Sequence, residues 1–348
     1  MNYNVPVFTL SGAVGPGVTA GNDRHIIWNA AADWPGQFSS QCKVKIIADD
    51  GALAPGTALP STAGLVLIPP GPFQMGDISA DGNIAERPVH TVYVSGFYMD
   101  QFEVSYELWR SVRTAALTVL DRTYSLGAGS SKADNHPVQS ISWYDAVIWC
   151  NARSEKEGLT PCYYTDATQT TIYRTGSLNL TNGCVKWTAN GYRLPTEVEW
   201  EKAARGGLTG KRFPWGDTIT HSNANYNSST GFAYGVSTTR NYHPSYGTGS
   251  QPFTSPVGSF PPNSYGLYDM AGNVWEWCWD WYDADWYPRA GATADNPRGP
   301  AIVLNYRVLR GGQWQGLANF ARCADRYFYF PVNAYDTVGF RCVRGLTF

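Results

Sequence analysis

The sequence predicts a protein of the α+β class, in which a small all-β module precedes a loop-rich domain. Short β-rich runs occupy the first 60 or so residues, three helix-start signals follow, and roughly the last 140 residues show no sustained helical periodicity. The chain also contains 36 Gly and 22 Pro among its 348 residues. Because these residues favour turns, we expect much of the backbone to lie in structured loops rather than in long regular elements.

The small β module is predicted from two β-rich runs, 24–28 and 42–47. The stretch 49–61 is polar and contains several Gly and Pro residues, which is typical of a linker. We therefore assign residues 1–62 to the module and its linker, and residues 63–348 to the main domain.

The main domain is expected to begin with strands and then a helix. An apolar run at 65–68 ends in a Pro-Pro-Gly turn, and alternation around 92–94 indicates a further strand. Ser105 is the expected N-cap of the first helix. The apolar residues of that helix recur at helical spacing and are Leu108, Trp109 and Val112.

Two further helices are each expected to begin with a capping box. In this motif the hydroxyl of the N-cap residue accepts from the backbone three residues later, and the acidic side chain there accepts from the N-cap backbone. A glycine after the last turn is expected to end each helix. The box residues and terminal glycines are Ser142, Asp145 and Gly158 for one helix, and Thr196, Glu199 and Gly206 for the other.

The charge balance argues against a protein that binds nucleic acid. The chain has 26 Lys and Arg against 28 Asp and Glu, a formal net charge of −2, and charged residues make up only 16 % of it. Disorder is excluded by 14 Trp, 22 Tyr and 14 Phe, which supply ample apolar surface for a core.

Targeting signals are absent from the sequence as far as it is given. No run approaches the roughly 18 apolar residues of a membrane-spanning helix, so we expect no membrane span. Residues 1–10 lack the basic and apolar regions of a signal peptide. Seven Cys residues are too few for a disulfide scaffold and leave the redox compartment open.

Common catalytic motifs are also missing. The five His residues are scattered, with no pair at metal-ligand spacing. No phosphate-binding loop, dinucleotide-binding glycine motif or nucleophile elbow occurs in a strand-to-helix context. Nucleotide and hydrolase chemistries are therefore poorly supported.

Six local motifs carry a family resemblance. In chain order they are RLPTEVEWE at 193–201, FPWG at 213–216, NSYGLYD at 263–269, GNVWEW at 272–277, VLRGG at 308–312 and GFR at 339–341. Together they resemble the formylglycine-generating enzyme or sulfatase-modifying-factor family, over roughly residues 63–344. The resemblance implies a variant of the C-type lectin-like fold.

The resemblance also implies that catalytic groups are missing. Oxidising members of the family bind copper through a pair of cysteine thiolates, and the matching positions hold Gly316 and Ala321. Cys323 is a single nearby thiol, which cannot replace a two-sulfur copper site. The three-histidine set of the iron-dependent relatives has no matching positions. We therefore expect no copper, no catalytic residues and no enzyme activity.

The segment that replaces the catalytic one has a second resemblance. Residues 317–337, within a segment of about 315–337, resemble the C-terminal variable region of proteins diversified by retroelements, in which adenines of Asn codons are randomised. The run contains no Lys, Glu, Met, Gln or Trp, which that route cannot produce, although Gln315 does not fit the pattern. The fixed positions implied by the resemblance are Arg322, Ala324, Arg326, Pro331 and the GFR motif.

Four consecutive aromatic residues, 327–330, favour a recognition surface on physical grounds alone. Whichever way a strand faces, at least two rings point in one direction. A buried core, the alternative, is expected to alternate large with small residues, whereas rigid rings beside Asn, Asp and Thr suit recognition. The predicted ligand-contacting residues are Leu317, Asn319, Phe320, Cys323, Asp325, Tyr327, Phe328, Tyr329, Phe330, Val332, Asn333, Tyr335, Asp336 and Thr337, while Arg322 and Arg326 are expected in structural ion pairs.

A calcium site is implied by the family resemblance. The matching ligands are the side chains of Asp269 and Glu276 and the backbone carbonyls of Gly272 and Val274. Oxygen donors with two negative charges suit this hard cation. The alternative is that Glu276 accepts backbone N–H groups with no ion present.

Two cysteines match disulfide-bonded positions of secreted family members, namely Cys150 and Cys342. Cys162 and Cys184 flank a polar loop and are a second candidate pair. Reduced, buried thiols are the alternative in both cases, and the sequence does not decide between them.

The sequence thus predicts a non-catalytic protein that binds a protein or glycan ligand through a diversified surface. The first alternative is an oxidoreductase of the sulfatase-modifying-factor type that uses the carboxylates Asp280, Asp283 and Asp285, although a solvated loop is favoured for these three. The second is a structural component of a cell surface or virion. The compartment stays open among the cell surface, the secreted state and a virion.

Overall fold

The computed structural model describes residues 10–12, 26–28, 64–120 and 123–346. The chain divides into two compact units, Met1–Leu59 and Pro60–Phe348. In the first unit, the described strands β1 (Leu10–Gly12) and β2 (Ile26–Trp28) form an antiparallel pair. The strand predicted at 42–47 lies outside the described residues.

The first sheet of the main unit joins strands that are distant in the sequence. Its order is β3-β6-β12-β7, and all neighbours in it are antiparallel. The strands are β3 (Leu65–Ile68), β6 (Phe97–Asp100), β7 (Tyr192–Arg193) and β12 (Val343–Gly345). Because β12 lies between β6 and β7, the end of the described chain is held inside the sheet.

The second four-stranded sheet carries the C-terminal motifs. Its order is β10-β9-β8-β11, with β10 and β11 at the edges. The strands are β8 (Trp275–Trp281), β9 (Arg307–Arg310), β10 (Tyr327–Tyr329) and β11 (Val338–Gly339). All seven residues of β8 are buried, so this strand forms the centre of the domain. A separate hairpin consists of β4 (Gly71–Met75) and β5 (His90–Val94).

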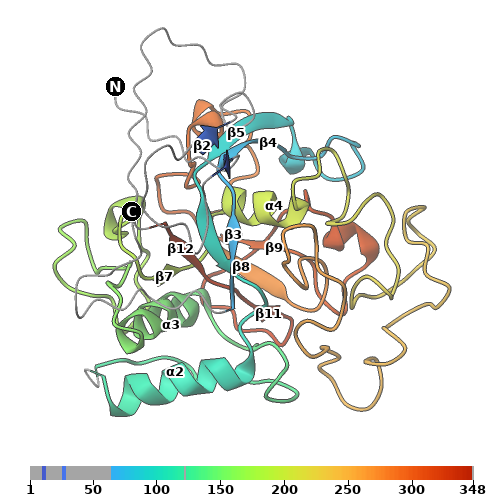
Figure 1. Cartoon of the computed structure of the whole chain (residues 1–348). Coiled ribbons are helices and arrows are strands. Elements are labelled where there is room, and N and C mark those ends of the chain that lie inside the picture. The colour runs from blue at the N-terminus through green and yellow to red at the C-terminus, as the bar shows by residue number, and fades with distance from the viewer. Residues whose placement is uncertain (1–9, 13–25, 29–63, 121–122, 347–348) are drawn as a thin grey trace, which may run out of the picture. The chain divides into compact units, whose positions relative to one another are not determined.

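The described residues of the main unit also form three α-helices (Figure 1), and their start signals are confirmed. They are α2 (Tyr106–Thr118), α3 (Trp143–Lys156) and α4 (Glu197–Arg205). Ser105 caps α2, the two predicted capping boxes open α3 and α4, and Gly206 ends α4 in the left-handed conformation at φ 55°. Helices α2 and α3 pack against each other, whereas α4 packs against the β4–β5 hairpin.

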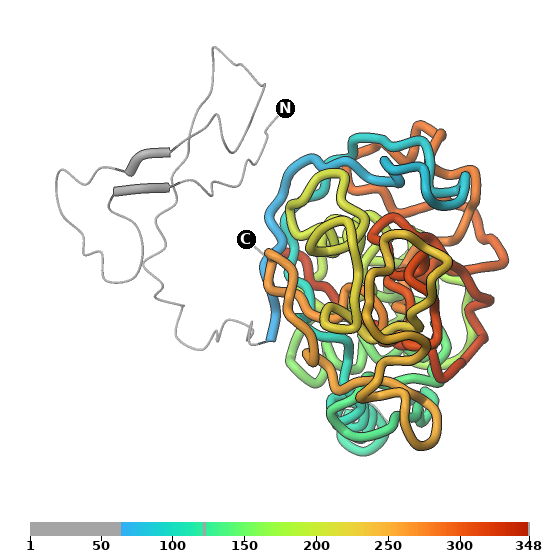
Figure 2. The backbone as a smooth tube through the Cα atoms, turned by 90° about the vertical axis from the view of Figure 1, so that its right-hand side faces the viewer, coloured from blue at the N-terminus to red at the C-terminus, as the bar shows by residue number. Residues whose placement is uncertain are grey.

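The rest of the described main unit is loop, as the Gly and Pro content predicts. Residues 206–274 contain no helix or strand and fold as yellow to orange loops over one side of the domain (Figure 2). Short 3-10 helices punctuate the other connections. They are η1 (Ile84–Glu86), η2 (Asn182–Cys184), η3 (Ala290–Thr293) and η4 (Ala318–Ala321). The α+β class is therefore confirmed.

Aromatic side chains dominate the core between α2, α3 and the second sheet. Trp109 of α2 stacks on Trp149 of α3 with ring centroids 5.7 Å apart, and Phe340 meets Trp149 edge to face at 5.3 Å. Such pairs add to the stabilisation from burial alone.

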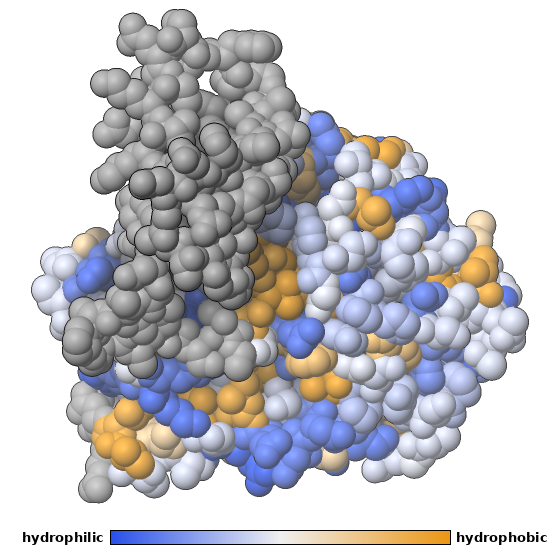
Figure 3. Space-filling model, viewed as in Figure 1, coloured by the Kyte–Doolittle hydropathy of each residue, from blue (hydrophilic) through white to orange (hydrophobic). Residues whose placement is uncertain are grey.

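Among the described residues, no helix is both long and apolar enough to cross a membrane. Hydrophobic residues form separate patches on the face seen in Figure 3.

Candidate binding surface

The predicted variable segment runs from η4 through edge strand β10 to β11. Strand β10 pairs on one side only, antiparallel to β9, with Phe328 opposite Val308. An edge strand keeps one row of backbone groups and part of each face open to the outside. The sheet therefore places the four consecutive aromatic residues at its border rather than at its centre.

The rings of these four residues alternate between the two faces of β10. On one face, Tyr327 stacks on Trp275 with centroids 5.0 Å apart, and Tyr329 contacts Tyr335 at 4.8 Å. On the other face, Phe328 and Phe330 both contact Tyr306, at 4.7 and 4.5 Å. Each face thus bears a continuous group of rings.

Exposure increases along the tetrad toward the following turn. Tyr327, Phe328 and Tyr329 are half-buried, whereas Phe330 is 49 % exposed. Val332 and Tyr335 are 64 % and 45 % exposed. We call residues 330–336 the tip loop. Its apolar side chains are accessible to a partner, which is the placement that the sequence predicts for a recognition surface.

Backbone hydrogen bonds hold the tip loop against the start of α3. Trp143 N donates to Pro331 O at 3.0 Å, and Ser140 N donates to Tyr335 O at 3.0 Å. Within the loop, Asn333 N donates to Phe330 O at 2.9 Å. The exposed side chains are therefore carried on a loop whose backbone is fixed at both ends.

The remaining predicted contact residues divide by burial. Leu317, Asn319, Phe320 and Asn333 are partly buried and Asp336 is exposed. Three others do not reach the surface: Cys323, Asp325 and Thr337 are only 0 %, 2 % and 7 % exposed. Burial raises the pKa of the Cys323 thiol to about 12 and that of Asp325 well above its ordinary value. These three are removed from the predicted surface: Cys323 and Asp325 flank the buried ion pairs of Arg322 and Arg326, and Thr337 leads into the buried strand β11, where its carbonyl accepts from Trp275 N.

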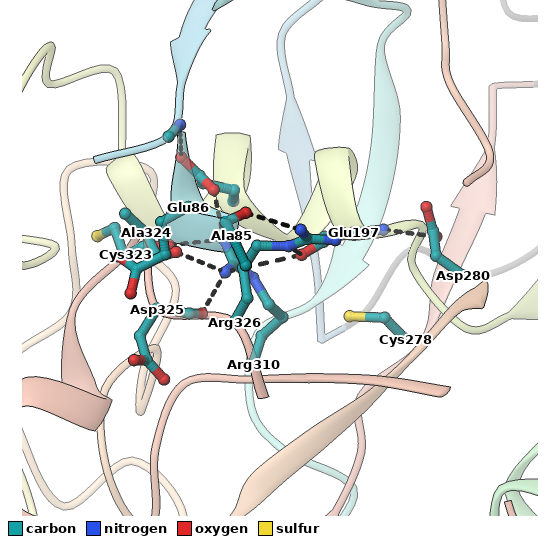
Figure 4. Close-up of polar contacts among 12 residues, drawn as sticks. Ala85, Glu86, Glu197, Cys278, Asp280, Arg310, Cys323, Ala324, Asp325 and Arg326 are labelled. Atoms are coloured by element: carbon teal, nitrogen blue, oxygen red, sulfur yellow. Dashed lines mark hydrogen bonds and ion pairs between the residues drawn. The ribbon is translucent and has the colours of Figure 1, made fainter. Parts of the chain in front are cut away.

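Buried ion pairs anchor the segment from beneath, as predicted for Arg322 and Arg326. Arg322 binds Glu86 with N–O distances of 2.6 and 2.8 Å, and Arg326 binds Glu197 at 2.7 and 2.9 Å. Arg310 donates to the backbone carbonyls of Cys323, Ala324 and Asp325 (Figure 4). Since each guanidinium bridges the segment to fixed elements, the frame does not depend on the side chains of the tip loop.

The two positions that match copper-binding cysteines are buried from solvent. Gly316 is buried and its carbonyl accepts from Asn227 N at 2.8 Å. Ala321 is 1 % exposed and packs in an apolar cluster with Phe213 and Tyr226. Among the described residues, no group of three or more His, Cys, Asp and Glu side chains could hold a metal ion.

The alternative carboxylate cluster does not form a common site. Asp280 is buried, contrary to the expected solvated loop, and its Oδ2 accepts from Glu197 N at 2.8 Å. Burial, together with the charge of Glu197, raises the pKa of Asp280 to about 8. Asp283 instead pairs with Arg289 at 3.0 Å, and Asp285 is exposed.

The four predicted calcium ligands are only partly suited to an ion. Glu276 is committed to a buried ion pair with Arg341 at 2.7 Å and accepts from Trp200 Nε1 at 2.8 Å. Asp269 differs, because its Oδ2 accepts from Gly258 N while its buried Oδ1 has no hydrogen-bond partner. Burial raises the pKa of Asp269 to about 6. The donor set therefore fits a cation at Asp269, but Glu276 is already neutralised.

Sequence reasoning missed three residues at these sites. Glu103 is buried beside the predicted calcium ligands and accepts from Val274 N at 3.2 Å. Tyr306 and Tyr282 form the floor beneath Phe328, with Tyr282 at 4.3 Å. The sequence held one signal for Tyr306. This residue comes just before the VLRGG strand, so it lies beside any strand that pairs with that strand.

The candidate disulfide partners Cys150 and Cys342 are neighbours. Their sulfur atoms are 3.5 Å apart and both residues are buried as free thiols. Cys162 and Cys184 are also buried and free. The structure therefore brings the first pair together in the reduced state.

Comparison with known proteins places this geometry in context. Residues 52–346 match the family model described as the sulfatase-modifying factor enzyme 1-like domain. The formylglycine-generating enzyme of Thermomonospora curvata is 33 % identical over 327 aligned positions, covering 80 % of this chain and 92 % of that enzyme. The serine/threonine-protein kinase pkn1 of Chlamydia caviae is 36 % identical over 81 % of this chain, which spans only 38 % of that protein.

Among solved structures, Treponema denticola variable protein 1 superposes with a TM-score of 0.60 at 30 % identity. The superposition covers 81 % of this chain and 95 % of that protein. The shared fold is the C-type lectin-like fold that the six sequence motifs imply.

Proposed function

The chain belongs to the sulfatase-modifying factor enzyme 1-like domain family, and from that premise we propose that it is a non-catalytic ligand-binding member of the family. In this proposal the tip loop and the rings of β10 bind the ligand. The single observation that carries the proposal is the exposure of Phe330, Val332 and Tyr335 on a loop with a fixed backbone.

The chemistry of the loop supports recognition of a protein or a glycan. Exposed rings bury large areas at low entropic cost, and they also stack on the apolar faces of sugars. Polar groups lie beside them, since Asn333 Nδ2 donates to the Tyr335 hydroxyl at 2.9 Å and Asp336 is exposed. This mixture gives apolar contact area with adaptable hydrogen bonds around it.

The residues at the two positions that match copper-binding cysteines support the non-catalytic part of the proposal. A copper site needs two thiolates, and Gly316 and Ala321 supply none. Both positions are also buried, so a substrate cannot reach them in this conformation. Relatives named formylglycine-generating enzymes are the reason to test this point directly.

Diversification by a retroelement is the proposed origin of the segment 315–337. The composition of the run supports it, and so does the likeness to a solved variable protein. A genomic test is direct: a near-identical template copy beside a reverse transcriptase gene is expected, differing from this stretch only at adenines. Differences at all four bases would contradict the proposal.

A structural calcium ion at Asp269 is the proposed cofactor. Its unpartnered Oδ1 is an oxygen donor of the type that calcium prefers, and the carbonyls of Gly272 and Val274 are the family-implied partners. The ion would hold the loop before β8 in place. It takes no part in a chemical step.

Binding is tested with the double variant Phe330→Ala/Tyr335→Ala. Purified protein is applied to arrays of immobilised glycans and of surface proteins, and hits are quantified by surface plasmon resonance. We expect the double variant to lose about 100-fold or more in affinity, since exposed aromatic anchors dominate interfaces. The matched control Leu117→Ala removes an exposed hydrophobic side chain on α2 and should bind like the wild type.

The enzymatic alternative has a separate test. The protein is incubated with a cysteine-containing sulfatase peptide, copper and oxygen, and formylglycine is sought by mass spectrometry. We expect no product above the level without protein. Turnover that is lost on substituting Asp280 would overturn the proposal and establish the carboxylate alternative.

A further inference from the structure

A pocket separate from the tip loop lies between the β4 turn and the end of α4. It has a volume of about 170 Å³, far more than one water molecule needs. Its walls are mixed, and the apolar residues that line it are Pro69, Pro70, Pro72, Phe73 and Leu208. The polar side chains that line it are Gln74, Lys202, Arg205, Thr209 and Tyr265.

Lys202 is the unusual group in this pocket. The residue is only 5 % exposed, and its ammonium donates to Gly71 O at 2.6 Å. An ammonium has three N–H donors, so one hydrogen bond leaves two to be satisfied. Within the described residues, Lys202 has no carboxylate within 4.0 Å and no aromatic ring beneath its charge.

Buried cations elsewhere in the described chain are compensated. Arg205, which also lines the pocket, is paired with Glu201 at 2.7 Å. Arg322, Arg326 and Arg341 have their own carboxylates, and Arg307 lies over the rings of Trp143 and Trp281. Burial of a charge without such compensation is costly. Lys202 is therefore a cation that lacks a counter-charge, at the wall of an open pocket.

Tyr265 lines the same pocket. Tyr265 is partly buried, and its hydroxyl makes no hydrogen bond within the described part of the chain. The hydroxyl lies over Gly207, where an added Cβ would approach it to 3.4 Å.

We propose that this pocket binds a small organic monoanion, a carboxylate with an apolar body. Lys202 supplies the one positive charge in the lining that has no paired carboxylate, and Tyr265 supplies a hydroxyl donor, while the proline, phenylalanine and leucine side chains contact the apolar body. One uncompensated cation matches one negative charge, and the apolar residues in the wall offer an organic carboxylate contacts that inorganic phosphate cannot make. Burial lowers the pKa of Lys202 to about 8, so a bound anion would also stabilise its charged form.

The probes are benzoate, its neutral isostere benzamide, and inorganic phosphate, each titrated into the full chain by calorimetry at pH 7. Benzoate is expected to bind, with benzamide and phosphate at least about tenfold weaker, because a charge-assisted hydrogen bond contributes about 1.5–3 kcal/mol. Equal binding of benzoate and benzamide would overturn the proposal. Equal binding of benzoate and phosphate would mean that the apolar residues of the pocket do not contact the ligand, and would overturn the proposal too.

Two variants assign the charge. Lys202→Met keeps the length of the side chain and should weaken benzoate binding about tenfold or more, whereas Lys186→Met, at an exposed lysine, should leave it unchanged. Benzoate binding to Lys202→Met at wild-type affinity would refute the site. If Lys202→Met does not fold, the wild-type pH profile decides: benzoate affinity should fall as pH rises from 7 to 9.5, and a flat profile contradicts the role of Lys202.

Discussion

The rings of Phe330 and Tyr306 lie 4.5 Å apart, although one belongs to the predicted variable segment and the other precedes strand β9. Phe328 rests on the same tyrosine at 4.7 Å. A residue outside the segment thus supports two rings within it. The ring of Tyr306 therefore stays the same whichever side chains the variable segment carries.

The free energy of unfolding should distinguish the exposed ring of Phe330 from the half-buried ring of Tyr327. Phe330→Ala is expected to lower the free energy of unfolding by about 1 kcal/mol or less, because half of the ring is already in water. Tyr327→Ala should cost about 3 kcal/mol, because its ring stacks on Trp275. Urea unfolding measures both. A larger loss for Phe330→Ala would favour the purely structural role of the tetrad.

Asp280 should make the protein less stable as pH rises. Its folded pKa of about 8 is above the ordinary 3.8, so between these values the folded state binds a proton that the unfolded state has released. The contribution of Asp280 to the free energy of unfolding is therefore greatest near pH 4 and declines as the pH rises toward 8. Asp269, with a pKa of about 6, contributes in the same direction up to that pH.

The variant Asp280→Asn tests this dependence. It cannot ionise, so unfolding free energies measured at pH 5, 7 and 9 should decline less than those of the wild type. Asp285→Asn, at an exposed aspartate in the loop that follows β8, is the matched control and should follow the wild type. Parallel curves for wild type and Asp280→Asn would show that Asp280 is not the titrating group.

Calcium should stabilise the protein through Asp269. Millimolar calcium is expected to raise the melting temperature of the wild type by several degrees, because a ligand that binds only the folded state shifts the equilibrium toward it. The variant Asp269→Asn should lose this shift, and Asp217→Asn, at a partly exposed aspartate that pairs with Lys211, should keep it. Differential scanning calorimetry with calcium or with a chelator gives the comparison. Identical shifts in all three proteins would place the ion elsewhere.

Oxidation should join Cys150 to Cys342. Their sulfur atoms are 3.5 Å apart, and a bond between them would close a long loop, which on chain-entropy grounds adds about 5 kcal/mol to stability. Peptide mapping under non-reducing conditions identifies the bond, and denaturant unfolding measures the gain. Cys278→Ser should oxidise normally. A Cys150–Cys162 bond in place of the expected one would contradict this prediction.

The helices were predictable because their signals are local. Ser142 with Asp145 and Thr196 with Glu199 form their hydrogen bonds within one turn, so a short stretch of sequence contains the whole motif. The alternation of rings along β10 was equally local. The exposure of its last member follows from the end of the strand at Tyr329.

Long-range pairings were not predictable from the residues alone. Glu276 was expected as a calcium ligand, but Arg341 occupies it from 65 positions away in the sequence. Asp280 was expected in solvent, yet β8 carries it into the centre of the sheet. The floor of the candidate surface depends on the pairing of β9 with β10, which sets Tyr306 beside Phe328.

The tip loop is attached through main-chain atoms, from Trp143 to Pro331 and from Ser140 to Tyr335. Backbone hydrogen bonds do not depend on side-chain identity, so the amino acids at 332–334 can be exchanged without loss of these two bonds. A loop attached in this way can present different side chains at one place on the scaffold while its backbone geometry stays the same.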